Sequence, residues 1–178
     1  LLLSCRSPFL DSDRVYPPLA NLYLHQAIKE RHPNVRVTVA DDYDLEDSQW
    51  LNGYDGVGIS IMTPQRAEAK KLLDFIKTRR PDITVFAGGP HVKHYQQDIE
   101  QEPWDYLEPN DGVRAISAIL NGDSRRILND IITVKEYKEQ WPKPNRMDNG
   151  EFLKAYNYKL QGTNSTTILT AQGCPEQC

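Results

Sequence analysis

Short apolar runs alternate with longer amphipathic segments from Leu1 to Leu120, and this alternation limits the fold more than any other feature. The run Gly56–Ile61 has the length and the Val/Ile content of a strand that is buried on both faces. The segment from Thr63 to Ile76 carries apolar residues at helical spacing. Strands joined by helices of this length form a parallel sheet with right-handed crossovers, and helices cover both of its faces.

The pattern predicts five strands and three main helices. The strands are expected at residues 1–5, 35–39, 56–61, 83–87 and 104–107, and the helices at 17–31, 63–76 and 113–120. Five such units predict an α/β domain of the flavodoxin-like (Rossmann-like), doubly wound type with a five-stranded parallel sheet. We assign this domain to residues 1–122.

The periodicity fades after residue 122, and Pro, Asn and Gly become frequent. We interpret residues 123–163 as a linker, with a short strand or helix near 131–137 and a helical turn near 152–156. The run Thr166–Thr170 is strand-like again. Residues 164–178 are therefore expected to start a second, truncated domain.

Composition excludes several classes of protein. A net charge of −4 argues against a broad nucleic-acid-binding surface. No apolar run approaches the roughly 20 residues that a membrane span needs. The three cysteines come without secretory features, so we expect a reducing, cytoplasmic location. Cys5, at the end of the first strand, is expected to be a small buried residue.

Three groups of unusual residues follow predicted strands. They are Ser60-Ile61-Met62-Thr63, Gly88-Gly89-Pro90-His91 and Asn110-Asp111-Gly112. The carboxyl ends of parallel strands meet at one edge of the sheet, where open α/β folds bind ligands. Glycine pairs at that edge let the backbone approach a ligand closely. The alternative is that these residues form ordinary turns between strands and helices.

The chain ends in Gly173-Cys174-Pro175-Glu176-Gln177-Cys178. Two thiols at this spacing in a Gly/Pro loop can turn toward one metal centre. A disulfide between Cys174 and Cys178 would close only a short loop and would gain little entropy. Two structural thiols, or an adventitious zinc site, remain the alternative.

Four stretches together resemble radical S-adenosylmethionine enzymes that carry an amino-terminal cobalamin (B12)-binding domain. They are Pro17–Leu24, Asp55–Pro64, Gly88–His91 and Thr170–Cys178. In this order and spacing they cover nearly the whole chain.

The resemblance implies a cluster motif Cys-x3-Cys-x2-Cys, in which Cys174 and Cys178 are the first two ligands of a [4Fe–4S] cluster that binds S-adenosyl-L-methionine. The run Thr166–Thr170 would be the first strand of the (β/α) barrel. The third cysteine would lie beyond Cys178, so this chain alone is expected to be inactive. Gln172 stands where many relatives carry Arg. A small-molecule substrate and an electron donor of the flavodoxin or ferredoxin type would be the partners.

The resemblance also implies cobalamin as a cofactor. Its nucleotide tail would lie along two loops, at Ser60, Met62 and Thr63 and at Gly88, Gly89, Pro90 and His91. The loop Arg6–Tyr16 lacks the histidine that methionine-synthase-type domains place beneath cobalt. A corrin with its own benzimidazole displaced, and with no histidine on cobalt, is therefore expected. His25 and His32 are expected at the surface or at a helix end.

The function that follows is the front part of a cobalamin-dependent radical enzyme, with methyl transfer to an unactivated carbon or a related rearrangement of a metabolite. The alternative is a flavodoxin-like binding or regulatory module without chemistry, or a degenerate B12 domain that serves as a scaffold. A receiver domain is disfavoured because the third strand ends in Ile61-Met62-Thr63, without an Asp. A flavin-binding domain is disfavoured because no Ser/Thr-rich loop follows the first strand.

Overall fold

The computed structural model describes residues 1–10, 12, 14–131 and 133–169. Its main sheet has five parallel strands in the order β2-β1-β3-β4-β5. The strands are β1 Leu2–Ser4, β2 Val39–Ala40, β3 Gly56–Ser60, β4 Thr84–Gly88 and β5 Tyr106–Glu108. This order is that of flavodoxin-like domains. The predicted five-stranded parallel sheet is therefore confirmed.

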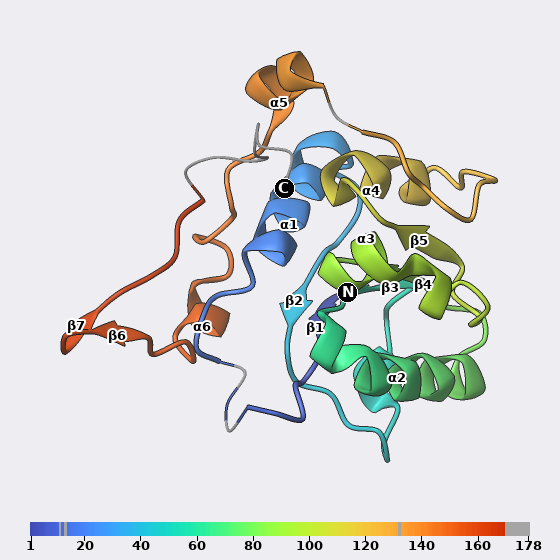
Figure 1. Ribbon diagram of the computed structural model, residues 1–178, viewed down its shortest axis with the longest axis horizontal. Coiled ribbons are helices and arrows are strands. Elements are labelled where there is room, and N and C mark those ends of the chain that lie inside the picture. The colour runs from blue at the N-terminus through green and yellow to red at the C-terminus, as the bar shows by residue number, and fades with distance from the viewer. Residues whose placement is uncertain (11, 13, 132, 170–178) are drawn as a thin grey trace.

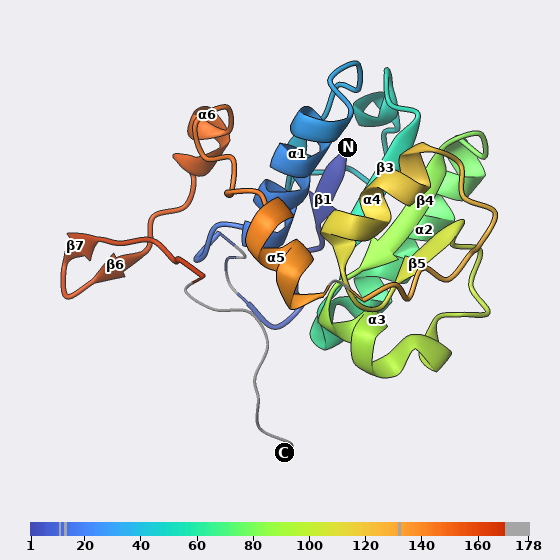
Figure 2. The ribbon, with the colours of Figure 1, turned by 90° about the horizontal axis from the view of Figure 1, so that it is seen from above.

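Helices cover both faces of this sheet (Figures 1 and 2). They are α1 Leu19–Arg31, α2 Arg66–Arg79, α3 Pro90–Tyr95 and α4 Gly112–Leu120, with single 3-10 turns at Gln49–Leu51, Thr63–Gln65 and Gln96–Asp98. Helix α2 packs on one face, where large aliphatic side chains of β3 and β4 form a continuous core. Helices α1 and α4 pack against each other and on the opposite face.

The segments after α4 are α5 Val134–Gln140, α6 Gly150–Leu153 and a small hairpin of β6 Lys159–Leu160 and β7 Thr163–Asn164. Part of this region packs on α1. The Trp141 ring lies 5.7 Å from that of Tyr23, and the backbone N–H of Asn145 donates to the carbonyl of Leu22 at 3.0 Å. The feature expected near 131–137 is thus a helix, and the helical turn expected near 152–156 forms slightly earlier.

Some expectations need correction. The second strand, predicted at residues 35–39, is shorter and begins later, at Val39–Ala40, because β1 pairs with it only through Leu2 and Leu3. Residues 166–169 form no strand, because no neighbouring strand lies beside them in the described part of the chain. The last part of the expected barrel strand, together with Cys174 and Cys178, lies outside the described residues.

The sequence also predicted the burial of Cys5 and the exposure of His25. Cys5 is buried as predicted. His25 was expected at the surface, and this prediction is wrong, because the segment after α5 covers its side of α1. Its ring lies beside the Asn149 side-chain amide, with 3.3 Å between Nδ1 and Nδ2. His32 ends α1, as expected, and its Nε2 lies 3.0 Å from the Ser117 hydroxyl. In the part of the chain that the structure describes, no helix is long and apolar enough to span a membrane.

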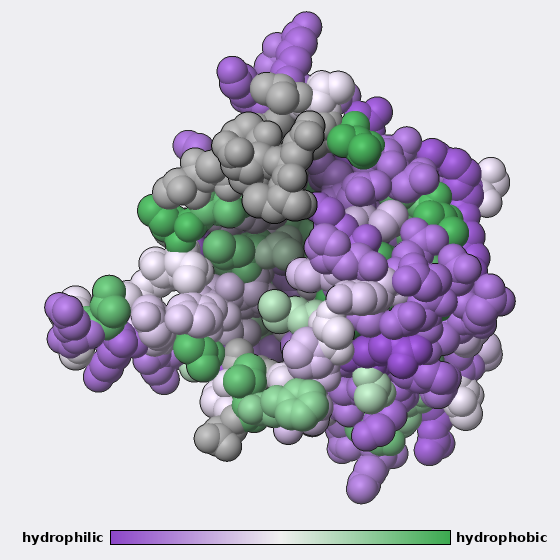
Figure 3. Space-filling model, in the orientation of Figure 1, coloured by the Kyte–Doolittle hydropathy of each residue, from purple (hydrophilic) through white to green (hydrophobic). Residues whose placement is uncertain are grey.

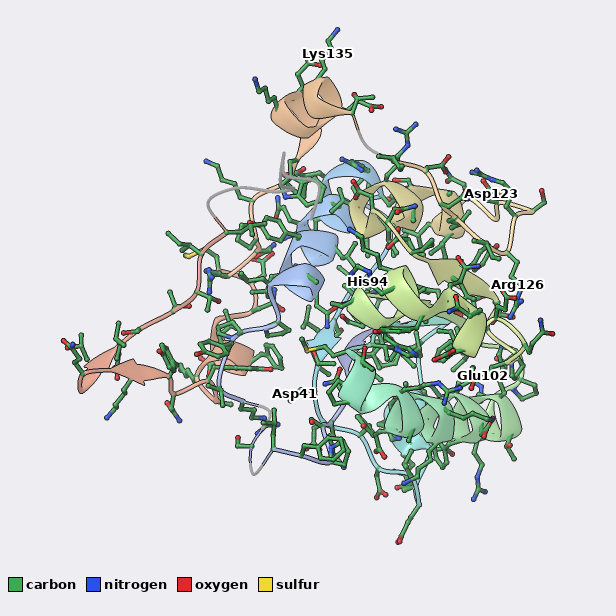
Figure 4. The ribbon with its side chains drawn as sticks, in the orientation of Figure 1. Asp41, His94, Glu102, Asp123, Arg126 and Lys135 are labelled. Atoms are coloured by element: carbon green, nitrogen blue, oxygen red, sulfur yellow. The ribbon has the colours of Figure 1, made fainter. Side chains whose placement is uncertain are left out.

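Arg126 ties the loop before β5 to the segment after α4 (Figure 4). Its guanidinium donates to the carbonyls of Trp104, Glu100 and Glu102 at 2.9, 2.5 and 2.6 Å. Hydrogen bonds from a charged donor contribute about 1.5–3 kcal/mol each when they are protected from water, and two of these are exposed. We expect Arg126→Ala to lower the free energy of unfolding by about 2 kcal/mol, as measured by urea denaturation.

The neighbouring Arg125 provides the control. It forms ion pairs with Asp123 and Asp130 at the surface. Exposed pairs contribute about 0–1 kcal/mol, so Arg125→Ala should be nearly neutral. Equal losses in the two variants would contradict the role given to Arg126.

Candidate functional site

A pocket of about 370 Å³ lies between the sheet and helices α1 and α4. We call it the α1/α4 pocket. Strands β1, β3 and β4 contribute its floor through residues such as Leu2, Gly58 and Gly88, and the helices contribute residues such as Tyr23 and Ile116. Trp141 and Leu169, from the segments after α4, also line it. The pocket therefore lies where β1 and β3 adjoin, the topological switch point of this strand order.

The pocket exists because the sheet face toward α1 and α4 carries small residues. Ser4, Ser60, Gly88 and Glu108 lie side by side across four strands. Successive residues of a strand point to opposite faces, so the neighbours of these residues fill the core beneath α2 instead. Ser4, Ser60 and Gly88 offer short side chains or none to the space below the helices, and Glu108 ends the row on β5. A cavity remains there.

A second row lies two residues closer to the amino ends of the strands. It consists of Leu2, Gly58 and Phe86, which are in register, and it is apolar. A Cβ at Gly58 would lie only 2.3 Å from the Phe86 ring, so this ring occupies the space that a larger residue would need. Phe86 also borders a second pocket, of about 690 Å³, at the amino edge of the sheet. The two pockets share Leu2, Phe86, Ile116 and Ile119, so these side chains separate them.

The end of the α1/α4 pocket at the carboxyl edge is polar. Glu108 and Asp111 are buried there, 6% and 5% exposed. Glu108 Oε1 accepts a hydrogen bond from the backbone N–H of Asn110 at 2.5 Å. Burial raises the pKa of Glu108 to about 7, although hydrogen bonds from the Asn110 and Asp111 backbone oppose the shift.

Asp111 caps helix α4. Its Oδ1 accepts from the backbone N–H groups of Val113 and Arg114 at 3.1 and 3.4 Å. Its Oδ2 is buried and has no hydrogen-bond partner among the described residues. Burial also raises the pKa of Asp111 above its ordinary value. On the opposite wall, the Asn21 amide donates to the Ser4 hydroxyl at 3.1 Å.

The loop after β4 turns at Gly89, whose φ of 98° and ψ of −177° are adopted almost only by glycine. This turn brings the chain back to β3: the N–H of Ile61 donates to the carbonyl of Gly88 at 2.9 Å, and the N–H of His91 donates to the carbonyl of Ile61 at 3.0 Å. The loops after β3 and β4 are thereby joined.

The structure brings part of the predicted site together. Ser60, Gly88 and Gly89 line the α1/α4 pocket. Met62, Thr63 and Pro90 are exposed. His91 is buried: its Nδ1 lies 3.4 Å from the Thr63 hydroxyl, its ring stacks on Tyr95, and burial lowers its pKa.

The sequence drew attention to some of the remaining pocket residues and not to others. Asn110, Asp111 and Gly112 were noted at this edge, and the structure places all three in the lining. Glu108 and Gly58 were missed. A signal for Glu108 was present, since it is a charged residue directly after the apolar pair Tyr106-Leu107.

Apolar side chains stand exposed on the loops that follow β1 and β3. Phe9, Leu10 and Met62 are 78%, 58% and 55% exposed. On the face seen in Figure 3, the area of α2, α3 and β5 is mainly hydrophilic, and hydrophobic residues are more frequent toward α1 and the C-terminal segments. Among the described residues, no group of His, Cys, Asp and Glu is arranged to hold a metal ion.

A family model for the B12 binding domain matches residues 11–119. No curated protein matches the chain. Among solved structures, the N-terminal domain of a hypothetical protein from Thermotoga maritima is similar, with 23% identity, coverage of 69% of this chain and 96% of that one, and a TM-score of 0.47.

Proposed function

Because this chain belongs to the B12-binding domain family, whose model matches residues 11–119, we propose that it binds a corrinoid and takes up its nucleotide tail in the α1/α4 pocket. The observation that supports this proposal is that small residues, Ser60 and Gly88 among them, leave this pocket open at the carboxyl edge of the sheet.

The size and chemistry of the pocket fit a tail. Ligand pockets usually measure about 300–1,000 Å³, so a pocket of about 370 Å³ can hold a part of a corrinoid but not the whole. Leu2, Gly58 and Phe86 would contact the flat, apolar base of the tail. The macrocycle would stay outside, over the carboxyl edge of the sheet.

The exposed apolar side chains after β1 and β3 support this arrangement. Phe9, Leu10 and Met62 offer apolar surface at the edge where the macrocycle would lie. The loop Arg6–Tyr16 has no histidine, and the buried ring of His91 faces Thr63 and Tyr95. We therefore propose that cobalt receives neither an imidazole from this chain nor the base that occupies the pocket. A corrinoid bound here would supply a cobalt centre able to carry a methyl group.

We further propose that this module serves a radical S-adenosylmethionine enzyme, in which Cys174 and Cys178 bind two irons of a [4Fe–4S] cluster. The support is the spacing of the two thiols in their Gly/Pro loop and the order of the sequence motifs before them. Methyl transfer to a small metabolite, with electrons from a flavodoxin- or ferredoxin-type donor, would be the reaction. The test is the residues encoded after Cys178: a cysteine at the third following position supports the cluster, and its absence contradicts it.

The alternative is a module that only binds or carries a corrinoid. The observation that favours it is the extent of the family match, which ends at residue 119, before the cysteines. A longer gene product that retains cobalamin but does not cleave S-adenosylmethionine under reducing conditions would support this alternative.

Corrinoid binding can be tested on the chain itself. Incubated with micromolar methylcobalamin and passed over a gel-filtration column, the protein is expected to retain the corrinoid. The absorption spectrum should shift to that of the form with the base displaced, because the pocket withdraws the base from cobalt. A colourless protein after the column would contradict the proposed function. Retention with an unshifted spectrum would contradict insertion of the tail.

A further inference from the structure

The polar groups that line the α1/α4 pocket differ in kind from those of a phosphate site. Phosphate sites use Arg, Lys or several backbone N–H groups. Among the residues lining this pocket in the described part of the chain, none is Lys, Arg or His. Its two carboxyl groups, those of Glu108 and Asp111, are already bonded to backbone N–H groups at this end of the pocket. The pocket therefore favours a ligand portion that donates hydrogen bonds and carries no negative charge.

Both acids keep one oxygen occupied by the protein. Glu108 Oε1 accepts from the backbone of Asn110, and Asp111 Oδ1 accepts from the first turn of α4. Glu108 Oε2 lies near the end of β4 and the start of α4. A Cβ atom placed on Gly88 would be 3.5 Å from this oxygen, and one placed on Gly112 would be 3.7 Å from it. Asp111 Oδ2 is the buried atom without a partner among the described residues. A buried acceptor without a donor costs about 1–3 kcal/mol, which a donating ligand would recover.

We infer that Glu108 and Asp111 bind the sugar hydroxyls of the corrinoid tail, and that the tail's phosphodiester stays outside the α1/α4 pocket. This rests on the proposed function, and it adds which part of the tail enters and which residues select it. Two acceptors at one end of an otherwise apolar pocket match an apolar base joined to a sugar. An anion next to two buried carboxyl groups would instead be repelled.

A hydroxyl also suits the protonation behaviour of this end of the pocket. The raised pKa of Glu108 means that its carboxyl exists in both forms near neutral pH. A sugar hydroxyl can donate to the carboxylate and can accept from the protonated acid. A ring nitrogen without a proton could accept only from the protonated acid. The contact with a hydroxyl therefore persists across neutral pH.

The test compares two corrinoids on the full chain. Cobalamin carries the tail, and cobinamide lacks the base, the sugar and the phosphate. We expect wild-type protein to bind cobalamin more tightly than cobinamide, and Glu108→Leu to lower cobalamin affinity at least tenfold while cobinamide affinity stays unchanged. Glu108→Gln, which can still bond a hydroxyl, should remain within about threefold of wild type. Glu151→Ala is the control, since Glu151 pairs with Lys154 at the surface.

The outcomes separate the two proposals. Failure of wild-type protein to bind either corrinoid contradicts the proposed function. Unchanged cobalamin affinity in Glu108→Leu overturns the inference and leaves the function standing, and so does an equal loss for both corrinoids. If Glu108→Leu does not fold, the ligand is altered instead of the protein. Cobalamin with methylated sugar hydroxyls should then bind wild-type protein at least tenfold more weakly than cobalamin, and equal binding would overturn the inference.

Discussion

Gly89→Ala is expected to lower the free energy of unfolding by about 3 kcal/mol. With φ at 98° and ψ at −177°, Gly89 lies in a region that is essentially restricted to glycine, and a side chain there costs about 1–3 kcal/mol. The new Cβ would also lie 3.0 Å from the backbone N and O of Ile61. Both atoms hold hydrogen bonds that join the loops after β3 and β4, so neither can shift freely.

Two other glycines serve as controls for this measurement by urea denaturation. Gly53 has φ of 82° but open space around it, so Gly53→Ala should cost only the backbone strain, about 1 kcal/mol. Gly150 has neither a positive φ nor a neighbour within 4 Å, so Gly150→Ala should be nearly neutral. A loss at Gly89 no greater than that at Gly53 would show that the contact with Ile61 contributes nothing.

Gly88→Val is expected to lower cobalamin affinity at least a hundredfold while the protein stays folded. A Cβ at Gly88 would meet Glu108 atoms at 3.5 Å or more, which is ordinary contact, and valine suits a strand. The added methyl groups would enter the α1/α4 pocket where the tail has to pass. A hundredfold loss corresponds to about 2.7 kcal/mol of binding free energy, the scale of a steric block.

Thr84→Val is the matched control, because Thr84 begins the same strand and lines the other pocket instead. Both variants should show the far-UV circular dichroism of the wild type, and only Gly88→Val should fail to retain methylcobalamin. Full binding by Gly88→Val would mean that the tail does not enter the α1/α4 pocket.

Elements that depend on one dominant physical signal could be predicted from the sequence. Apolar runs such as Gly56–Ile61 predicted strands because strands buried on both faces need continuous hydrophobicity, and the sheet has the predicted five strands. Helix α3 was missed because Val92 is the only aliphatic residue in its short sequence, Pro90-His91-Val92-Lys93-His94-Tyr95, so no periodicity appears. The Gly88-Gly89-Pro90 run before it indicates only a turn.

The candidate site was predicted less completely, because a pocket depends on register. The sequence indicates that Ser60 lies near the end of the third strand and that Gly88 follows the fourth, but it does not indicate that Glu108 lies beside Gly88 in the same row. The fifth strand was expected to end at Leu107, which left Glu108 in a loop, whereas β5 includes it. The burial of Asp111 and His25 likewise depends on packing between segments distant in sequence.

The two pockets are separated by side chains and not by the backbone, and Phe86 is the one aromatic ring among them. A single substitution at Phe86 would therefore change how deep the α1/α4 pocket is for a ligand. A descendant of this chain with a small residue at that position would have a deeper α1/α4 pocket, reaching toward the amino edge of the sheet. Such a substitution would let the same fold bind a longer ligand.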